Sequence, residues 1–427
     1  MNVSAEPAAP SARATLLTLT VLSALAFMDR QILSVLLVPV KADFGLSDLQ
    51  AGLVSGVGFA ISFGLLALPL GRLGDRRERR SLVAACRGLG GALAALGAAA
   101  GSAWSLALTR MGGAVSDAGG APASMSMIAD LYPPHERSQA MGVYAMGASA
   151  GALLALLGGA WVAQRWGWRA TLAVVGGAGL LAAIAMRAIV REPERGRWAI
   201  AASAPMPSQG GVAAVWRQPV ARWLIVAAGF ILLSAYSFGA WNFAYLMRAM
   251  GLGFQQAGWA TGLAAVASML AAPVSGWLAD RIARRSPGAQ IGVPMAGLAL
   301  ALPLGLAYLA LPPSAIVAAV LLMTVYAFFV AWWIAPVYAL LSLVVPTQHR
   351  GVANAMVMLV GAVGGGGIGP VLTGALADAM ARWVDGDPLR PALALMLALI
   401  VPSWLALRRA RQHHLAQQAH AAATQAS

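Results

Sequence analysis

Four charged side chains fall inside long apolar segments of this 427-residue chain, namely Asp29, Arg30, Arg110 and Asp117. An ionisable residue within an apolar span is costly to bury and usually serves a function. Arg110 and Asp117 are separated by about two helical turns, or about 10 Å of rise, so they share one face of a helix. No charged residue lies in the interior of the apolar segments after residue 220, so these charges are confined to the N-terminal half.

The types of these residues indicate anion binding and proton transfer. A guanidinium binds a carboxylate or phosphate with paired hydrogen bonds, so we expect Arg30 and Arg110 to bind an anionic substrate group. Burial and a neighbouring arginine act oppositely on a carboxyl proton, so Asp117 or Asp29 is the expected proton-coupling site. The alternative is a permanent structural ion pair between Asp29 and Arg110. Arg87 is expected to extend its charged end to the cytoplasmic lipid headgroups.

The C-terminal half offers aromatic and amide side chains in place of charges. Such residues on helices pack or anchor at interfaces, but they can also form the apolar wall of a binding site. We expect the substrate-contacting residues of this half to be Tyr236, Trp241, Asn242, Tyr326, Trp332, Trp333 and Asn354.

The composition excludes a soluble or disordered protein. Apolar residues make up 59% and charged residues 10% of the chain, whereas soluble proteins carry about 25% charged residues. The mean hydropathy is +0.73. The single cysteine excludes an internal disulfide. The histidines lie outside the apolar segments, and there is no phosphate-binding glycine loop with lysine, so we expect no metal, no cofactor and no enzymatic activity.

Apolar segments long enough to span a membrane set the predicted fold. It is an all-α integral membrane protein of twelve transmembrane helices in two pseudo-symmetric six-helix bundles. The expected spans are 15–38, 49–71, 81–101, 104–129, 138–160, 170–190, 221–247, 256–278, 289–310, 314–343, 351–375 and 391–408. The expected organisation is a tail at 1–13, bundles at 14–190 and 221–408, a Pro/Gly-rich linker at 191–220 and a tail at 409–427.

The net charge of +14 would indicate nucleic acid in a soluble protein, but here most basic residues fall in alternate loops. This pattern places both termini and the linker in the cytoplasm, where arginines contact anionic lipids, and it excludes a nucleic-acid partner. We therefore expect a multi-pass protein of the bacterial inner membrane.

A loop sequence occurs once in each half. Gly71-Arg72-Leu73-Gly74-Asp75-Arg76 follows the second span, and Gly276-Trp277-Leu278-Ala279-Asp280-Arg281 follows the eighth. A second repeated loop ends in Arg137 and Arg350. We expect a cytoplasmic gate in which acidic groups pair with arginines in one state and release them in another. Its members are Gly71, Asp75, Arg76, Arg79, Arg80, Arg137, Asp280, Arg281 and Arg350.

This first loop resembles the signature of the major facilitator superfamily, with Glu78 where the signature has glycine. Met28-Asp29-Arg30-Gln31 is similar to its spinster-like branch, as are Ser126, Asp130 and Pro133 in the fourth span and Arg191-Glu192-Pro193 after the sixth. Asp117 stands where that branch has glutamate. Two parallel six-helix repeats joined by a cytoplasmic linker are the plan of secondary transporters, so we expect alternating access by a monomer. The resemblance to the spinster-like branch implies an amphiphilic anion such as a lysophospholipid as substrate.

Other functions stay open on the sequence alone. The protein is expected to be proton-coupled, but the substrate is alternatively a small organic anion or drug-like acid. An uncoupled lipid scramblase, a transport-dead sensor or an intramembrane enzyme are alternatives of other classes.

Overall fold

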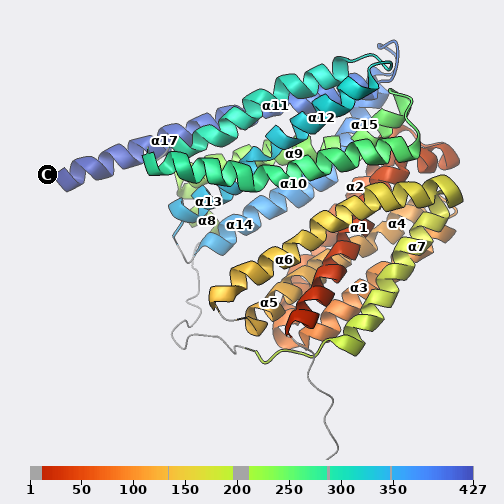
Figure 1. The fold of residues 1–427 in the computed structure, drawn as a ribbon, viewed down its shortest axis with the longest axis horizontal. Helices are drawn as coiled ribbons and strands as arrows, with labels where there is room; N and C mark the ends of the chain where they lie inside the picture. Colours follow the sequence, from red (N-terminus) through yellow and green to blue (C-terminus); the bar gives the residue numbers. More distant parts are fainter. Residues whose placement is uncertain (1–11, 133, 196–210, 286–288, 347–348, 427) are drawn as a thin grey trace, which may run out of the picture. The chain divides into compact units, whose positions relative to one another are not determined.

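A computed structural model describes residues 12–132, 134–195, 211–285, 289–346 and 349–426. Every regular element within these residues is helical, and the chain divides into two compact units (Figure 1). Unit 1 comprises Met1–Pro39 and Gly58–Ala204, and unit 2 comprises Val40–Val57 and Pro205–Ser427. The end of the first helix and the beginning of the second are thus packed into unit 2.

The first seven α-helices contain the six predicted spans of the N-terminal half. Their bounds are α1 Ala12–Phe44, α2 Asp48–Arg76, α3 Arg79–Leu96, α4 Ala103–Val115, α5 Ala121–Leu131, α6 Pro134–Leu153 and α7 Ala160–Ile189. A π-helical turn, η2 (Ser116–Gly120), joins α4 to α5, and another, η3 (Leu154–Gly159), joins α6 to α7. The predicted fourth span is therefore a helix interrupted at Asp117.

The fifth and sixth spans are separated by one glycine rather than by the predicted interval between residues 160 and 170. Gly167 has a φ of 79° inside α7, a conformation that other residues rarely adopt. The chain is helical on both sides of it, and this single residue supplies the break.

The C-terminal half contains the other six predicted spans, with α8 before them. The bounds are α8 Gly211–Arg217, α9 Pro219–Arg248, α10 Phe254–Arg285, α11 Gly292–Ala310, α12 Ile316–Val330, α13 Ile334–Val344, α14 Arg350–Leu359, α15 Gly369–Met380, α16 Leu389–Ala398 and α17 Ile400–Ala426. The π-helical segment η7 (Val360–Ile368) and the 3-10 turn η5 (Ala331–Trp333) each interrupt one span. Helix α17 continues well past residue 408 and extends beyond its neighbours (Figure 1).

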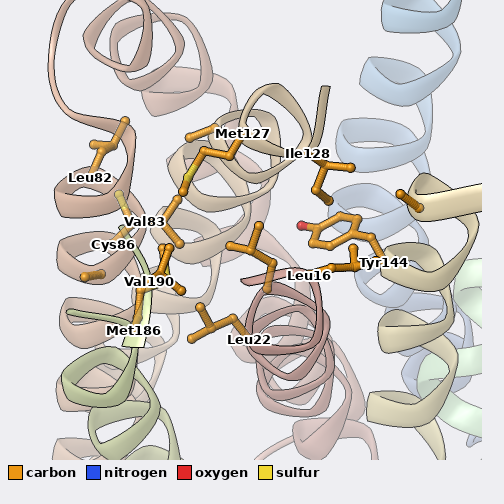
Figure 2. Packing of buried hydrophobic residues seen from close by; sticks show 14 residues of the cluster. Leu16, Leu22, Leu82, Val83, Cys86, Met127, Ile128, Tyr144, Met186 and Val190 are labelled. Atoms are coloured by element: carbon orange, nitrogen blue, oxygen red, sulfur yellow. The ribbon is translucent and has the colours of Figure 1, made fainter. Parts of the chain in front are cut away.

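The core of unit 1 gathers buried side chains from α1, α3, α5, α6 and the end of α7. Figure 2 shows Leu16 and Leu22 of α1 among Met127, Tyr144 and Met186. This cluster packs α1, which carries Asp29 and Arg30, against α3, α5 and α6.

Helices α3 and α7 approach closely because both carry glycine where they meet. A Cβ atom added to Gly176 would lie 2.2 Å from the backbone nitrogen of Ala95, and one added to Gly91 would lie 2.8 Å from the Gly176 carbonyl oxygen. Backbone atoms cannot move aside as side-chain ends do, so this contact requires glycine.

Substitution of Gly176 by alanine should therefore destabilise the protein by about 1–3 kcal/mol, the usual cost of overpacking. The matched control is Gly177→Ala, because a Cβ at Gly177 meets no atom within 4 Å. Thermal unfolding in detergent measures both variants. Equal unfolding temperatures for the two would contradict the described packing.

Candidate functional site

The four predicted intramembrane charges form two ion pairs within unit 1. Arg110 of α4 donates from Nη1 to Oδ1 of Asp29 at 2.9 Å and from Nη2 to the Asp29 backbone oxygen. Arg30 lies 3.6 Å from Asp117, measured from Nη1 to Oδ2. Since Asp29 and Arg30 are consecutive in α1, the two pairs lie beside each other and link α1 to α4 and η2.

The two pairs differ in their contact with the surroundings. The side chains of Asp29 and Arg110 are 0% and 6% exposed, whereas those of Arg30 and Asp117 are 21% and 18% exposed. The Asp29–Arg110 pair is thus the enclosed ion pair that the sequence offered as an alternative. The Arg30–Asp117 pair is thus the longer and the more exposed of the two.

Two aromatic rings lie close to the Arg30 guanidinium. Its guanidinium carbon lies 4.5 Å from the centre of the Phe59 ring and 5.6 Å from that of Phe27. Such rings attract a cation held within about 6 Å of their centres. The positive charge of Arg30 therefore lies next to the apolar surface of two aromatic rings.

Asp117 is carried by an irregular turn rather than by a regular helix. It lies in η2, where the hydroxyl of Ser116 donates to the Cys86 carbonyl oxygen of α3 at 3.2 Å. π-Helical turns often occur at functional sites. The turn keeps Asp117 facing α1, as the spacing from Arg110 predicts.

The expectation for Arg87 is wrong. Its side chain does not extend to the headgroups but is buried, with 3% exposure. The sequence correctly places it in α3, yet it does not specify which way the helix turns that side chain.

A separate cluster forms around Arg79 at the beginning of α3. Its guanidinium donates to Asp130 at 2.5 Å, Glu192 at 2.7 Å and Ser126 at 2.9 Å, and to the carbonyl of Pro193 at 3.0 Å. These partners lie on α5 and at the start of the linker, and all four belong to the segments that resemble the spinster-like branch. Arg80 also binds Glu192 through its backbone nitrogen at 2.7 Å.

The other predicted gate residues make fewer contacts. Arg76, Asp280 and Arg281 are exposed, and Arg281 lies over the Trp277 ring. A Cβ at Gly71 would meet no atom within 4 Å, so no close approach requires glycine there. The side chains of Asp75, Arg137 and Arg350 lie outside the described part of the structure.

Glu78, the departure from the family signature, precedes α3 with a φ of −57°, which needs no glycine. Its carboxylate accepts a hydrogen bond from Ser81 and lies 2.9 Å from Arg80. The Ser81 hydrogen bond, assisted by the Arg80 charge and opposed by slight burial, lowers the pKa of Glu78.

The predicted substrate contacts of the C-terminal half differ in burial. Trp241 is fully buried and donates to the Pro370 carbonyl at 2.9 Å, while Asn242 accepts from Tyr308 at 2.8 Å. Tyr326 and Trp333 are buried, Tyr236 and Trp332 are half-buried, and Asn354 is exposed. Trp241 and Asn242 are therefore occupied by contacts within unit 2.

Unit 2 also contains a charge cluster that the sequence analysis missed. Asp48 pairs with Lys41 and with Arg248, the latter at 2.8 Å, and Arg248 also binds Asp387 at 3.0 Å. Asp378 accepts from the backbone nitrogens of Asp48 and Leu49 at the start of α2. Charged residues at span ends are ordinarily solvated, so their sequence positions do not indicate that they meet. The one sequence feature that could have indicated this cluster is an acidic residue at a helix N-terminus, where a negative charge is favourable.

The helices and the buried charges together define a multi-pass integral membrane protein. Ten stretches of the described chain are long and apolar enough to cross a membrane by length and composition, and one of them, Ala140–Ile189, contains the break at Gly167.

The family follows from the sequence comparison. The model of the Major Facilitator Superfamily matches residues 19–370 and 224–426, so the chain belongs to this superfamily of membrane transporters. An "MFS-type efflux pump" of Mycolicibacterium smegmatis is 31% identical over 402 residues, or 92% of each chain.

Two further comparisons confirm the resemblance to the spinster-like branch. "Protein spinster homolog 1" of Homo sapiens is 31% identical over 175 residues, covering 40% of this chain and 33% of the human protein. The crystal structure of a bacterial homologue of the human lysosomal transporter Spinster has the same fold. Its TM-score is 0.82 at 24% identity, covering 94% of this chain and 97% of that one.

The difference between the two ion pairs predicts different effects on stability. Asp29→Asn leaves Arg110 buried without a carboxylate, which costs about 3–5 kcal/mol for a buried pair. Asp117→Asn should cost less, because its partner is farther away and more exposed. Thermal unfolding in detergent compares the two variants, and an equal or larger loss for Asp117→Asn would contradict the assignment.

The cluster around Arg79 predicts a similar loss. Arg79→Met leaves Asp130 and Glu192 without their guanidinium and should lower the unfolding temperature strongly, by the same buried-pair argument. Arg76→Met is the control, because Arg76 is exposed at the end of α2, three residues before Arg79. The cluster has no stabilising role if both variants unfold like the parent protein.

Proposed function

We propose that the protein is a proton-coupled secondary transporter that moves an amphiphilic anion, such as a lysophospholipid, by alternating access. The observation that carries this proposal is the Arg30–Asp117 pair, which is the looser and more exposed of the two intramembrane pairs. An anionic head group binds Arg30, and the rings of Phe27 and Phe59 offer apolar surface beside it.

Proton coupling follows from competition for Arg30. A substrate anion that binds this guanidinium displaces the Asp117 carboxylate, which then holds a proton more readily because its counter-charge is engaged. By reciprocity, a proton on Asp117 releases Arg30 and strengthens anion binding. The anion and the proton therefore bind together, and substrate affinity rises as pH falls.

The remaining residues take supporting roles in this proposal. Asp29 and Arg110 hold α1 against α4, so that Arg30 and Asp117 keep their register. The arginine clusters at the helix ends act as the gate. The aromatic and amide residues of the C-terminal half stay a prediction as substrate contacts. We place both termini in the cytoplasm and the chain in the bacterial inner membrane on the distribution of basic residues. The functional unit in this proposal is a monomer.

A small organic anion or drug-like acid is the second candidate. The name of the Mycolicibacterium relative, an efflux pump, states no substrate and is compatible with this class. Arg30 would bind its carboxylate in the same way, so the two substrate classes differ only in the apolar part.

The test uses purified protein in proteoliposomes, with fluorescently labelled lysophosphatidylglycerol and with benzoate as probes. We expect transport of the lipid probe to be driven by an inward proton gradient, and Asp117→Asn to remove the pH dependence of transport and of binding. Glu78→Gln is the matched control, since it removes a carboxylate in the loop.

Three outcomes would overturn parts of the proposal. Transport of benzoate alone would replace the lipid by the small anion. Lipid exchange that needs no gradient and ignores Asp117→Asn would make the protein a scramblase. Coupled transport that keeps its pH dependence in Asp117→Asn would exclude Asp117 as the coupling residue.

A further inference from the structure

Arg87 of α3 is a buried cation that the proposed mechanism has not used. Its side chain is 3% exposed, and none of its three guanidinium nitrogens has a hydrogen-bond acceptor among the described protein atoms. Enclosing an ion without a bonded partner is unfavourable, and natural proteins retain such a charge only where other charges or a function compensate.

The fold makes room for this guanidinium at one place on α7. A Cβ atom added to Gly179 would lie 2.6 Å from Nη2 and 3.2 Å from Cζ and Nε of Arg87. The guanidinium therefore lies against the bare backbone of α7. The adjacent residue of α3, Cys86, accepts a hydrogen bond from Ser116, which ties the turn that carries Asp117 to the same part of α3.

Among the described charged groups inside unit 1, Arg87 is the guanidinium that has no carboxylate partner. Apart from the cluster around Arg79, whose guanidinium is paired with Asp130 and Glu192, the interior of its described part holds the carboxylates of Asp29 and Asp117, and the guanidiniums of Arg30, Arg110 and Arg87. Arg110 pairs with Asp29 and Arg30 with Asp117, so Arg87 has no carboxylate of its own. Both carboxylates nevertheless act on Arg87 electrostatically, Asp29 more strongly than Asp117, and among the cations that act on Asp117, Arg87 comes second after Arg30.

We propose that Arg87 is a positioning residue that serves as the second counter-charge of Asp117. This inference rests on the proposed function. When a substrate anion engages Arg30, Asp117 loses its bonded partner. The fixed positive charge of Arg87 then still stabilises the ionised form of the Asp117 carboxylate. Asp117 can then both bind and release a proton within the working pH range. Without Arg87 it would stay protonated throughout the transport cycle.

Several other groups face Asp117 and bear on its proton. They are Asp29 and Arg30 of α1 and the hydroxyl of Tyr144 of α6, together with Arg110 of α4, which is bonded to Asp29. Asp29 and Arg110 offset each other as a bonded pair, and Tyr144 carries no charge. Arg30 is the group that the substrate would occupy. Arg87 is therefore the remaining cation whose charge no bonded carboxylate offsets.

The test is a pH titration of the Asp117 carboxyl by infrared spectroscopy of the full-length protein in lipid. The protonated carboxyl band is assigned to Asp117 by its loss in Asp117→Asn. Arg87→Met removes the charge while filling the space with an apolar side chain, so it should fold and be at least as stable as the parent. We expect its Asp117 midpoint to move to higher pH by about one unit or more, because the proton is held more tightly without the nearby cation.

Two control variants separate charge from packing. Arg87→Lys keeps the charge and should keep the parent midpoint. Gly179→Ala crowds the guanidinium without changing the charge and should also keep it. A double variant, Arg87→Met with Asp117→Asn, should show the same pH-independent substrate binding as Asp117→Asn alone.

The outcomes separate this inference from the proposed function. An unchanged Asp117 midpoint in folded Arg87→Met would overturn the role of Arg87 while leaving Asp117 as the coupling site. A strong loss of thermal stability in both Arg87→Met and Arg87→Gln would assign Arg87 a structural role instead. If Asp117→Asn leaves pH-dependent binding intact, the proposed function fails and this inference fails with it.

Discussion

The ion pair between Asp29 and Arg110 is the interaction on which the arrangement of unit 1 depends. It is enclosed among apolar helices, where neither group can be left without the other except at large cost. Arg110 also binds the Asp29 backbone oxygen, so the pair fixes both the rotation and the height of α1 against α4. The neighbouring residue Arg30 is positioned as a consequence.

A single enclosed pair thus allows a second pair to be weak. Arg30 and Asp117 lie farther apart and are partly exposed, and the turn that carries Asp117 is a π-helical irregularity. A structure held only by such a pair would move whenever a ligand competed for it. Because Asp29 and Arg110 bond α1 to α4 in addition to the apolar core, we propose that the Arg30–Asp117 contact can open to substrate and proton without separating these helices.

Sequence reasoning succeeded where the membrane itself is the constraint. Apolar length predicted the helical spans, and the cost of an intramembrane charge selected Asp29, Arg30, Arg110 and Asp117, which the structure brings together. It failed for Arg87, because depth along a span does not determine which way a side chain turns. It also missed Asp48 and Asp378, which meet across a long separation in the chain and would be solvated at the ends of isolated helices.

The central claim is that a substrate anion and a proton bind together because Asp117 is displaced from Arg30. Titration calorimetry of lysophosphatidylglycerol binding, repeated in buffers of different ionisation enthalpy, counts the protons exchanged on binding. With buffer pH set so that Asp117 is ionised in the free protein, our account predicts uptake of about one proton per anion bound, and none in Asp117→Asn. Anion binding with no proton exchange, or with proton release, would contradict it.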